Sequence, residues 1–131
     1  MVINKNCLKE RQTIQKTKIL EYLCSVTSHP NAETIYNHVK KVIPSITLAT
    51  VYRNLNLLAK NKKILKLEIN NEFRFDGDLS HHQHCICKKC GRISDGFNKK
   101  INEYALKNLN NNFKIDQVQI YYYGTCKNCK K

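Results

Sequence analysis

The sequence contains no long apolar run. Among its 131 residues, no segment approaches the roughly eighteen consecutive apolar residues that a membrane-spanning helix needs. The first residues, MVINKNCLKE, also contain no apolar core of the kind found in a secretion signal. We therefore expect no membrane span and a location in the cytoplasm, where the seven cysteines favour metal binding or redox chemistry over structural disulfides.

Acidic residues are also scarce. Ten Asp and Glu residues stand against 23 Lys and Arg residues, which gives a formal net charge of +13 and a pI near 9.5. The excess is spread over both halves of the chain, so it is not a basic tail. Such a charge points first to nucleic acid as a partner and second to an acidic membrane surface. A lysine-rich surface that is merely soluble is the simpler alternative.

Three amphipathic segments in the first half predict helices. They are 13–26, which begins at the capping residue Thr13, 32–43, which ends before Pro44, and 47–60, which begins at Thr47. Their apolar residues recur at helical intervals and predict a core made of Ile19, Leu20 and Leu23, of Ile35, Val39 and Val42, and of Leu48, Val51, Leu55 and Leu58.

After the third helix the apolar pattern changes to alternation. Residues 64–69 and 73–77 flank Asn70 and Asn71, which tolerate the positive φ of a tight hairpin turn. Three helices followed by a hairpin form a winged helix, a fold that suits DNA binding. The polar face of the third helix and the base of the hairpin predict DNA contacts at Thr50, Tyr52, Arg53, Asn56, Lys62 and Lys63.

The second half predicts a smaller α/β domain, so the fold class is α+β. Residues 85–97 indicate strands around a glycine turn, 98–111 a helix that buries Ile101, Ala105 and Leu109, and 117–124 another strand. A short polar linker precedes these elements. We therefore divide the chain into a DNA-binding domain at 1–77, a hinge at 78–81 and a second domain at 82–131.

Two CxxC pairs carry the strongest chemical signal. Their residues are Cys87, Cys90, Cys126 and Cys129. Four thiolates suit a closed tetrahedral zinc site, and the chain between the pairs is long enough to hold a helix and a strand. A redox pair is the alternative, but neither pair opens a helix. The remaining cysteines, Cys7, Cys24 and Cys85, are expected to be free or buried thiols.

A second group of possible ligands combines histidine with aspartate. His82 and His84 alternate along an extended segment and therefore point to the same side. Asp76, Asp95 and His29 are further donors, and three nitrogens with two oxygens suit Fe²⁺ or Mn²⁺. The simpler alternatives are a polar surface for the histidines, a turn cap for Asp76 and a solvated strand end for Asp95.

Four stretches resemble successive signatures of the ferric uptake regulator (Fur) family. They are HPNAETIY, ITLATVYRNLNLL, RFDGDLSHHQHCICKKCGRISD and YYYGTCKNC, in the family's order and spacing. The match extends from Arg11 to Cys129. Asp76 and Asp95 are aspartates, as in the peroxide-responsive branch, whereas iron-uptake regulators more often have glutamates at the matching places.

The resemblance implies a homodimeric winged-helix repressor that binds double-stranded DNA at a pseudo-palindromic operator and dimerises through its second domain. By position, it implies structural zinc at Cys87, Cys90, Cys126 and Cys129, and regulatory Fe²⁺ or Mn²⁺ between the domains at His29, Asp76, His82, His84 and Asp95. Peroxide would be sensed when iron-catalysed oxidation adds oxygen to His29 or His82. Oxidation of Cys85 or of a zinc thiolate is the competing way to sense it.

Two other functions remain open, and a third is not expected. A repressor of the same family that senses iron or zinc sufficiency would respond to metal and not to peroxide. A zinc-stapled RNA-binding protein would not need His29, Asp76 or Asp95. An enzyme is not expected, because the HxE and PCxxC signature of zinc deaminases is missing, as is an evident general base or nucleophile beside the metal ligands.

Overall fold

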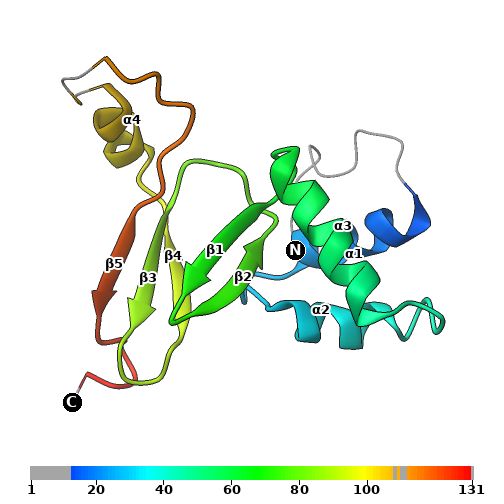
Figure 1. Cartoon of the computed structure of the whole chain (residues 1–131). Helices are drawn as coiled ribbons and strands as arrows, with labels where there is room; N and C mark the ends of the chain where they lie inside the picture. The colour runs from blue at the N-terminus through cyan, green and yellow to red at the C-terminus, as the bar shows by residue number, and fades with distance from the viewer. Residues whose placement is uncertain (1–12, 108, 110–111, 131) are drawn as a thin grey trace. The chain divides into compact units, whose positions relative to one another are not determined.

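The computed structural model describes residues 13–107, 109 and 112–130 (Figure 1). These residues fall into two compact units, the first ending at Leu79 and the second beginning at Ser80. Both residues lie within the predicted hinge, 78–81. Among the described residues, no helix is both long and apolar enough to cross a membrane.

Three helices in the described part of the first unit begin at side-chain caps. They are α1 (Ile14–Ser25), α2 (Ala32–Val39) and α3 (Leu48–Lys60). Oxygens of Thr13, Asn31 and Thr47 each accept the backbone N–H of the residue three positions ahead, over 3.3, 2.9 and 3.2 Å. Each cap satisfies an N–H group that has no partner inside its helix, which is why α1 and α3 begin where the sequence predicts.

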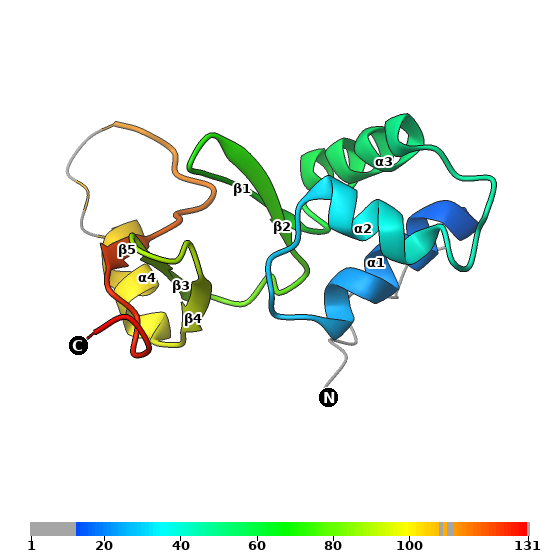
Figure 2. The same cartoon turned by 90° about the horizontal axis from the view of Figure 1, so that it is seen from below.

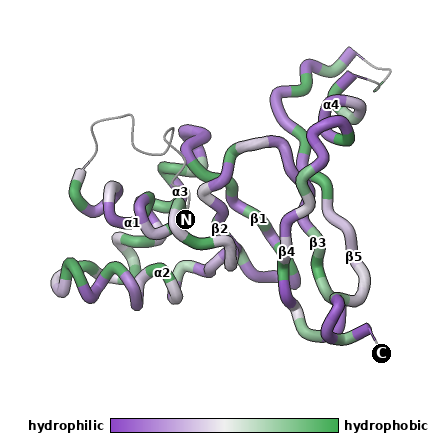
Figure 3. Tube along the Cα trace, turned by 180° about the vertical axis from the view of Figure 1, so that it is seen from behind, coloured by the Kyte–Doolittle hydropathy of each residue, from purple (hydrophilic) through white to green (hydrophobic). Residues whose placement is uncertain are grey.

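The apolar faces of these helices form the core of the first unit. Ile19, Leu20 and Leu23 of α1 and Val51, Leu55 and Leu58 of α3 are all at most 3% exposed. These predicted core residues are confirmed, whereas Leu48 is only half-buried. The helices contact one another, and each contacts the hairpin that follows (Figure 2). Apolar and hydrophilic residues alternate along each helix, as an amphipathic helix requires (Figure 3).

Helix α2 is shorter than the sequence indicates. It ends at Val39 and not just before Pro44, and Val42 is 57% exposed instead of buried, so both expectations are wrong. The reason is a tight turn in which the N–H of Val42 bonds to the carbonyl of Val39 over 2.9 Å. This three-residue turn rotates Val42 off the apolar face, while Ile35 and Val39 are buried as predicted.

The hairpin agrees with the sequence prediction. β1 (Leu65–Ile69) and β2 (Glu72–Asp76) pair antiparallel. Asn70 and Asn71, which connect them, have φ angles of 54° and 63°, the backbone of a two-residue turn whose twist matches that of the strands. The three helices followed by this hairpin confirm the winged helix.

The second unit contains a three-stranded sheet in its described part. The strands are β3 (Gln83–Cys87), β4 (Ile93–Gly96) and β5 (Tyr121–Gly124), in the spatial order β4-β3-β5. β3 pairs antiparallel with β4 and parallel with β5. The predicted strands are present, although β5 begins at Tyr121 and not at residue 117.

Helix α4 (Lys99–Lys107) does not pack through the apolar residues that the sequence predicted to be buried. Ile101 and Ala105 are only half-buried and Leu109 is 55% exposed, so this expectation is wrong. The buried residue is Asn102, whose Oδ1 accepts a hydrogen bond from Gln83 Nε2. The described part of so small a unit offers little apolar surface to cover a helix, and paired amides attach it instead.

Gly77 follows β2 and lies against the backbone of α1. A Cβ at this position would be 2.9 Å from both the carbonyl carbon and the carbonyl oxygen of Leu23. We predict that Gly77→Ala lowers the free energy of unfolding by about 1–3 kcal/mol, because backbone must shift to admit the methyl group. Thermal unfolding measures the loss. Gly124→Ala is the control, since its Cβ meets no described atom within 4 Å; equal melting temperatures of the two variants would contradict the close contact.

Candidate metal centres

Four cysteine sulfurs meet at one end of the sheet in the second unit. Cys87 is the last residue of β3, and Cys126 follows the end of β5. Because the two strands run parallel, with Cys87 opposite Gly124, both CxxC turns leave the sheet at the same end. The sulfurs of Cys87, Cys90, Cys126 and Cys129 all lie within 4.8 Å of one another. The structure therefore brings the four predicted zinc ligands together.

The separation of the sulfurs fits a tetrahedral zinc ion. Cys90 Sγ and Cys126 Sγ are 3.7 Å apart. Four sulfurs placed about 2.3 Å from a central zinc ion are separated from one another by about 3.8 Å. All four cysteines are free thiols, so they are available as ligands. The number, type and spacing of the donors match a closed structural site.

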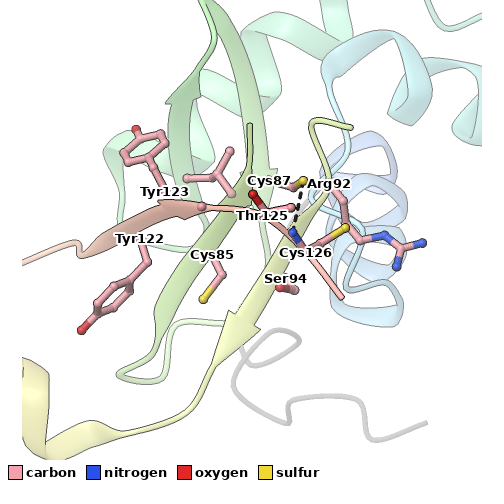
Figure 4. Close-up of a pocket in the computed structure, with 10 residues that line it drawn as sticks. Cys85, Cys87, Arg92, Ser94, Tyr122, Tyr123, Thr125 and Cys126 are labelled. Carbon is pink, nitrogen blue, oxygen red and sulfur yellow. Dashed lines mark hydrogen bonds between the residues drawn. The ribbon is translucent and has the colours of Figure 1, made fainter. Parts of the chain in front are cut away.

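Backbone N–H groups favour the thiolate form in this cluster. The N–H groups of Cys90 and Cys126 donate to Cys87 Sγ over 3.5 and 3.3 Å, the second bond being the dashed line in Figure 4, and they lower the pKa of the Cys87 thiol to about 6. The N–H of Cys129 likewise lowers the pKa of Cys126. The pKa of Cys129 is raised to about 12, chiefly by its hydrogen bond with the Cys126 sulfur. A metal ion that binds Cys129 Sγ must displace the proton of this thiol.

His29 and Asp76 form a buried pair in the first unit. His29 precedes α2, Asp76 ends β2, and they are 2% and 5% exposed. His29 Nε2 is 3.3 Å from Asp76 Oδ2. The other oxygen, Oδ1, accepts the N–H of Asp78 over 2.9 Å, so Asp76 also caps a turn, as the simpler alternative expects. The pair presents one nitrogen and one oxygen that can share a cation.

The buried side chains of His82 and His84 form a second group with the half-buried Asp95, in the second unit. The two Nε2 atoms are 3.1 Å apart, and Asp95 Oδ1 lies 3.6 Å from that of His82 and 3.8 Å from that of His84. The sequence prediction that the two imidazoles point to the same side is thus confirmed. They are 4% and 1% exposed, so they do not form a polar surface.

The carbonyl of Ser80 orients the first imidazole of this group. His82 Nδ1 is 2.7 Å from this oxygen and therefore donates its proton to it. This leaves the lone pair of Nε2 directed toward His84 and Asp95, an arrangement typical of metal-binding histidines. The sequence did not reveal Ser80, because any residue type carries a backbone carbonyl.

The predicted DNA contacts lie on α3 and in the turn that follows it. Tyr52 is 41% exposed, Arg53, Asn56 and Lys62 are also exposed, and Thr50 and Lys63 are half-buried. Asn56 Oδ1 accepts a hydrogen bond from Lys66 Nζ over 3.0 Å, which ties the hairpin to α3. The exposed members present hydrogen-bond donors and positive charge to solvent, which suits base edges and phosphates.

Cys24 and Cys85 lie outside both groups of possible ligands. Cys85 is an exposed free thiol beside a cavity of about 230 Å³ that Ser94 and Tyr122 also line (Figure 4). Cys24 forms a disulfide, so the expectation of a free or buried thiol is wrong there, because residue type alone does not reveal pairing. Cys7 lies outside the described residues.

The chain is similar to known regulators. The sequence pattern of the ferric uptake regulator family matches residues 8–123. The peroxide-responsive repressor PerR of Staphylococcus epidermidis is 34% identical over 123 residues, which cover 92% of this chain and 82% of that protein. The peroxide operon regulator of Bacillus subtilis is also 34% identical over 123 residues, with 92% and 85% covered.

A solved structure supports the same relationship. The crystal structure of the Campylobacter jejuni peroxide stress regulator matches with a TM-score of 0.75 and 32% identity, over 88% of each chain. Since the family pattern covers most of the sequence and these relatives align with it over most of their lengths, the protein belongs to the ferric uptake regulator family.

Proposed function

We propose that the protein is a metal-dependent, DNA-binding transcriptional repressor that responds to peroxide, and that it is not an enzyme. The observation that carries the proposal is the group formed by His82, His84 and Asp95, whose donor atoms lie 3.1 to 3.8 Å apart. Two imidazole nitrogens and a carboxylate oxygen this close together can bind a single cation. The peroxide response is supported by two relatives at 34% identity, a peroxide-responsive repressor and a peroxide operon regulator.

Zinc bound by Cys87, Cys90, Cys126 and Cys129 would have a structural role. One cysteine of each pair lies at or close to the end of a sheet strand, so the bound ion would cross-link β3 to the segment that follows β5. In a small unit, the free energy of such a site contributes directly to folding. The N–H groups directed at Cys87 Sγ hold this sulfur as a thiolate ligand.

Fe²⁺ or Mn²⁺ would be the regulatory ion, bound jointly by His29, Asp76, His82, His84 and Asp95. The support is the chemistry of the donors: three imidazole nitrogens and two carboxylate oxygens, without thiolate, suit these ions. The first unit supplies one nitrogen and one oxygen, so neither unit is a complete site alone. Metal binding then raises DNA affinity to the extent that the ion prefers the DNA-binding arrangement of the two units.

Double-stranded DNA would be contacted by α3, with Tyr52 and Arg53 at base edges and the lysines at phosphates. The second unit would form a homodimer, as the family resemblance implies, and the interface would cover some of its exposed apolar side chains, such as Phe97 and Tyr104, which are 67% and 70% exposed. A symmetric dimer carries two copies of α3 and therefore reads a pseudo-palindromic operator. The repressor would act in the cytoplasm.

Fe²⁺ bound in the regulatory site would donate electrons to hydrogen peroxide. His29 and His82 are the side chains that we expect to gain oxygen, as the resemblance to the peroxide-responsive branch implies, and both are buried beside a carboxylate. An oxidised imidazole is a weaker nitrogen donor, so these residues would then release the ion. The two units would lose the arrangement that binds DNA.

The first test concerns the four-sulfur group. We predict that Cys126→Ser loses its stoichiometric zinc and dissociates to monomers, because an open coordination position weakens a site that contributes to folding. Metal analysis and size-exclusion chromatography measure both effects. Cys85→Ser, which changes an exposed thiol outside the group, should retain zinc and the dimer. Full zinc occupancy in a dimeric Cys126→Ser variant would refute the assignment.

The second test concerns the regulatory ion. Mn²⁺ should raise the affinity of the zinc-loaded protein for selected DNA by about tenfold or more. Asp95→Ala should keep its zinc and remain a dimer but lose this stimulation, measured by fluorescence anisotropy on a DNA fragment selected with the wild-type protein. Asp116→Ala removes an exposed carboxylate of the same unit and serves as the control. Undiminished stimulation in Asp95→Ala would refute the joint site, and nucleic-acid binding that ignores Mn²⁺ in all proteins would favour the RNA-binding alternative.

The third test concerns peroxide. After stoichiometric peroxide, peptide mass analysis should find one added oxygen on His29 or His82 in the Fe²⁺ form alone, with loss of DNA binding that reductant does not reverse. The Mn²⁺ form should stay bound to DNA. Loss that a thiol reductant reverses, with both histidines unmodified, would assign sensing to Cys85 or a zinc thiolate. DNA binding that persists in the Fe²⁺ form would instead favour a sensor of iron or zinc sufficiency.

A further inference from the structure

His29 has a backbone conformation that its residue type and position disfavour. Its φ is 53°, in the left-handed region that residues with a Cβ seldom adopt. The next residue is Pro30, and a proline confines the residue before it largely to extended backbone. Such a conformation persists only when surrounding contacts hold it.

The side chain of Arg74 contacts this strained segment directly. Its Nε donates to the carbonyl oxygen of His29 over 2.5 Å, and one terminal nitrogen reaches the carbonyl oxygen of Ser28 at 3.5 Å. The other terminal nitrogen lies 3.9 Å from a carboxylate oxygen of Glu72. The planar guanidinium thus spans two successive carbonyls, a geometry that the single ammonium of lysine does not reproduce.

Two further bonds hold the residues that follow His29. The backbone N–H of Phe75 donates to the carbonyl of Pro30 over 2.9 Å, and Asn31 Nδ2 donates to Glu72 Oε1 over 2.7 Å. The first bond joins two backbone groups and does not involve Arg74, whereas the second shares Glu72 Oε1 with the Arg74 guanidinium. The segment should therefore stay docked on β2 when Arg74 is replaced, while the peptide of His29 itself loses a charge-assisted hydrogen bond.

Arg74 and Asp76 lie two residues apart on β2 and therefore face the same side of the strand. The strand thus provides both the group that bonds to the His29 backbone and the carboxylate 3.3 Å from its Nε2 atom. We propose that Arg74 is a positioning residue, which holds His29 in the left-handed conformation and so keeps its imidazole directed at Asp76 for metal binding. This inference rests on the proposed regulatory site.

The experiment uses the zinc-loaded full chain and two readouts. The ¹³Cα and ¹³Cβ chemical shifts of His29, recorded without further metal, distinguish left-handed from extended backbone. Calorimetric titration with Mn²⁺ measures affinity. Arg74→Met keeps the apolar stem and removes the guanidinium, Arg74→Lys keeps the charge without the fork, and Arg92→Met makes the same chemical change at an exposed arginine of the second unit.

We expect the His29 shifts to move toward extended values in Arg74→Met and Mn²⁺ to bind about 10–100-fold more weakly, the cost of losing a group that orients a ligand. The His29 shifts and the Mn²⁺ affinity of Arg74→Lys should lie between those of Arg74→Met and the wild type. Both quantities should match the wild type in Arg92→Met. Should Arg74→Met fail to fold, Arg74→Lys carries the same two readouts.

Unchanged His29 shifts and unchanged Mn²⁺ affinity in a folded Arg74→Met variant would overturn the proposal, as would an equal loss of affinity in Arg92→Met. A different outcome separates the two hypotheses. If the wild type binds no Mn²⁺ while the His29 shifts still respond to Arg74→Met, the regulatory metal site fails and the positioning of His29 by Arg74 stands.

Discussion

The parallel pairing of β3 with β5 is the constraint on which the second unit depends. It joins strands that are separated by β4 and α4 in the sequence, and it sets Cys87 opposite Gly124. Cys126 therefore follows directly beyond the same end of the sheet, where its N–H reaches Cys87 Sγ over 3.3 Å. Parallel pairing of distant segments is entropically costly to form, and four thiolates bound to one ion would secure it.

Strand β3 also separates two kinds of metal chemistry. Its last residue, Cys87, belongs to the sulfur group, while His84 lies opposite Asp95 in the antiparallel ladder with β4. Soft sulfur donors and harder nitrogen and oxygen donors are thus kept apart along one rigid element, which favours different ions at the two places. This arrangement explains how a short segment rich in both cysteine and histidine can serve two sites.

In the first unit, strand β2 connects the His29–Asp76 pair to the hairpin. It begins after the hairpin turn and ends at Asp76, and Arg74 bonds to the backbone of His29 from the same face. A change in the His29–Asp76 pair therefore acts on the strand that forms the hairpin. The hairpin is in turn tied to α3 by the bond between Lys66 and Asn56, so the possible metal ligands and the predicted DNA contacts of this unit are joined by a continuous set of interactions.

The sequence by itself determined the features that depend on near neighbours. Caps at Thr13 and Thr47 and the Asn70–Asn71 turn were predictable, because a side chain's hydrogen bond to its own helix and the tolerance of asparagine for positive φ are local properties. The identity of the possible ligands was also readable, since CxxC and HxH spacings place donors on one turn or one face.

Only the tertiary structure decided which distant groups meet and which apolar residues are covered. It placed Val42 outside the core and attached α4 through Asn102, where periodicity had suggested apolar contacts. It also revealed the roles of Ser80 and Arg74, which act on the two histidine groups through backbone carbonyls. The physical reason is that burial and carbonyl contacts depend on how strands far apart in the chain pair and pack, and no local pattern of residue types encodes that.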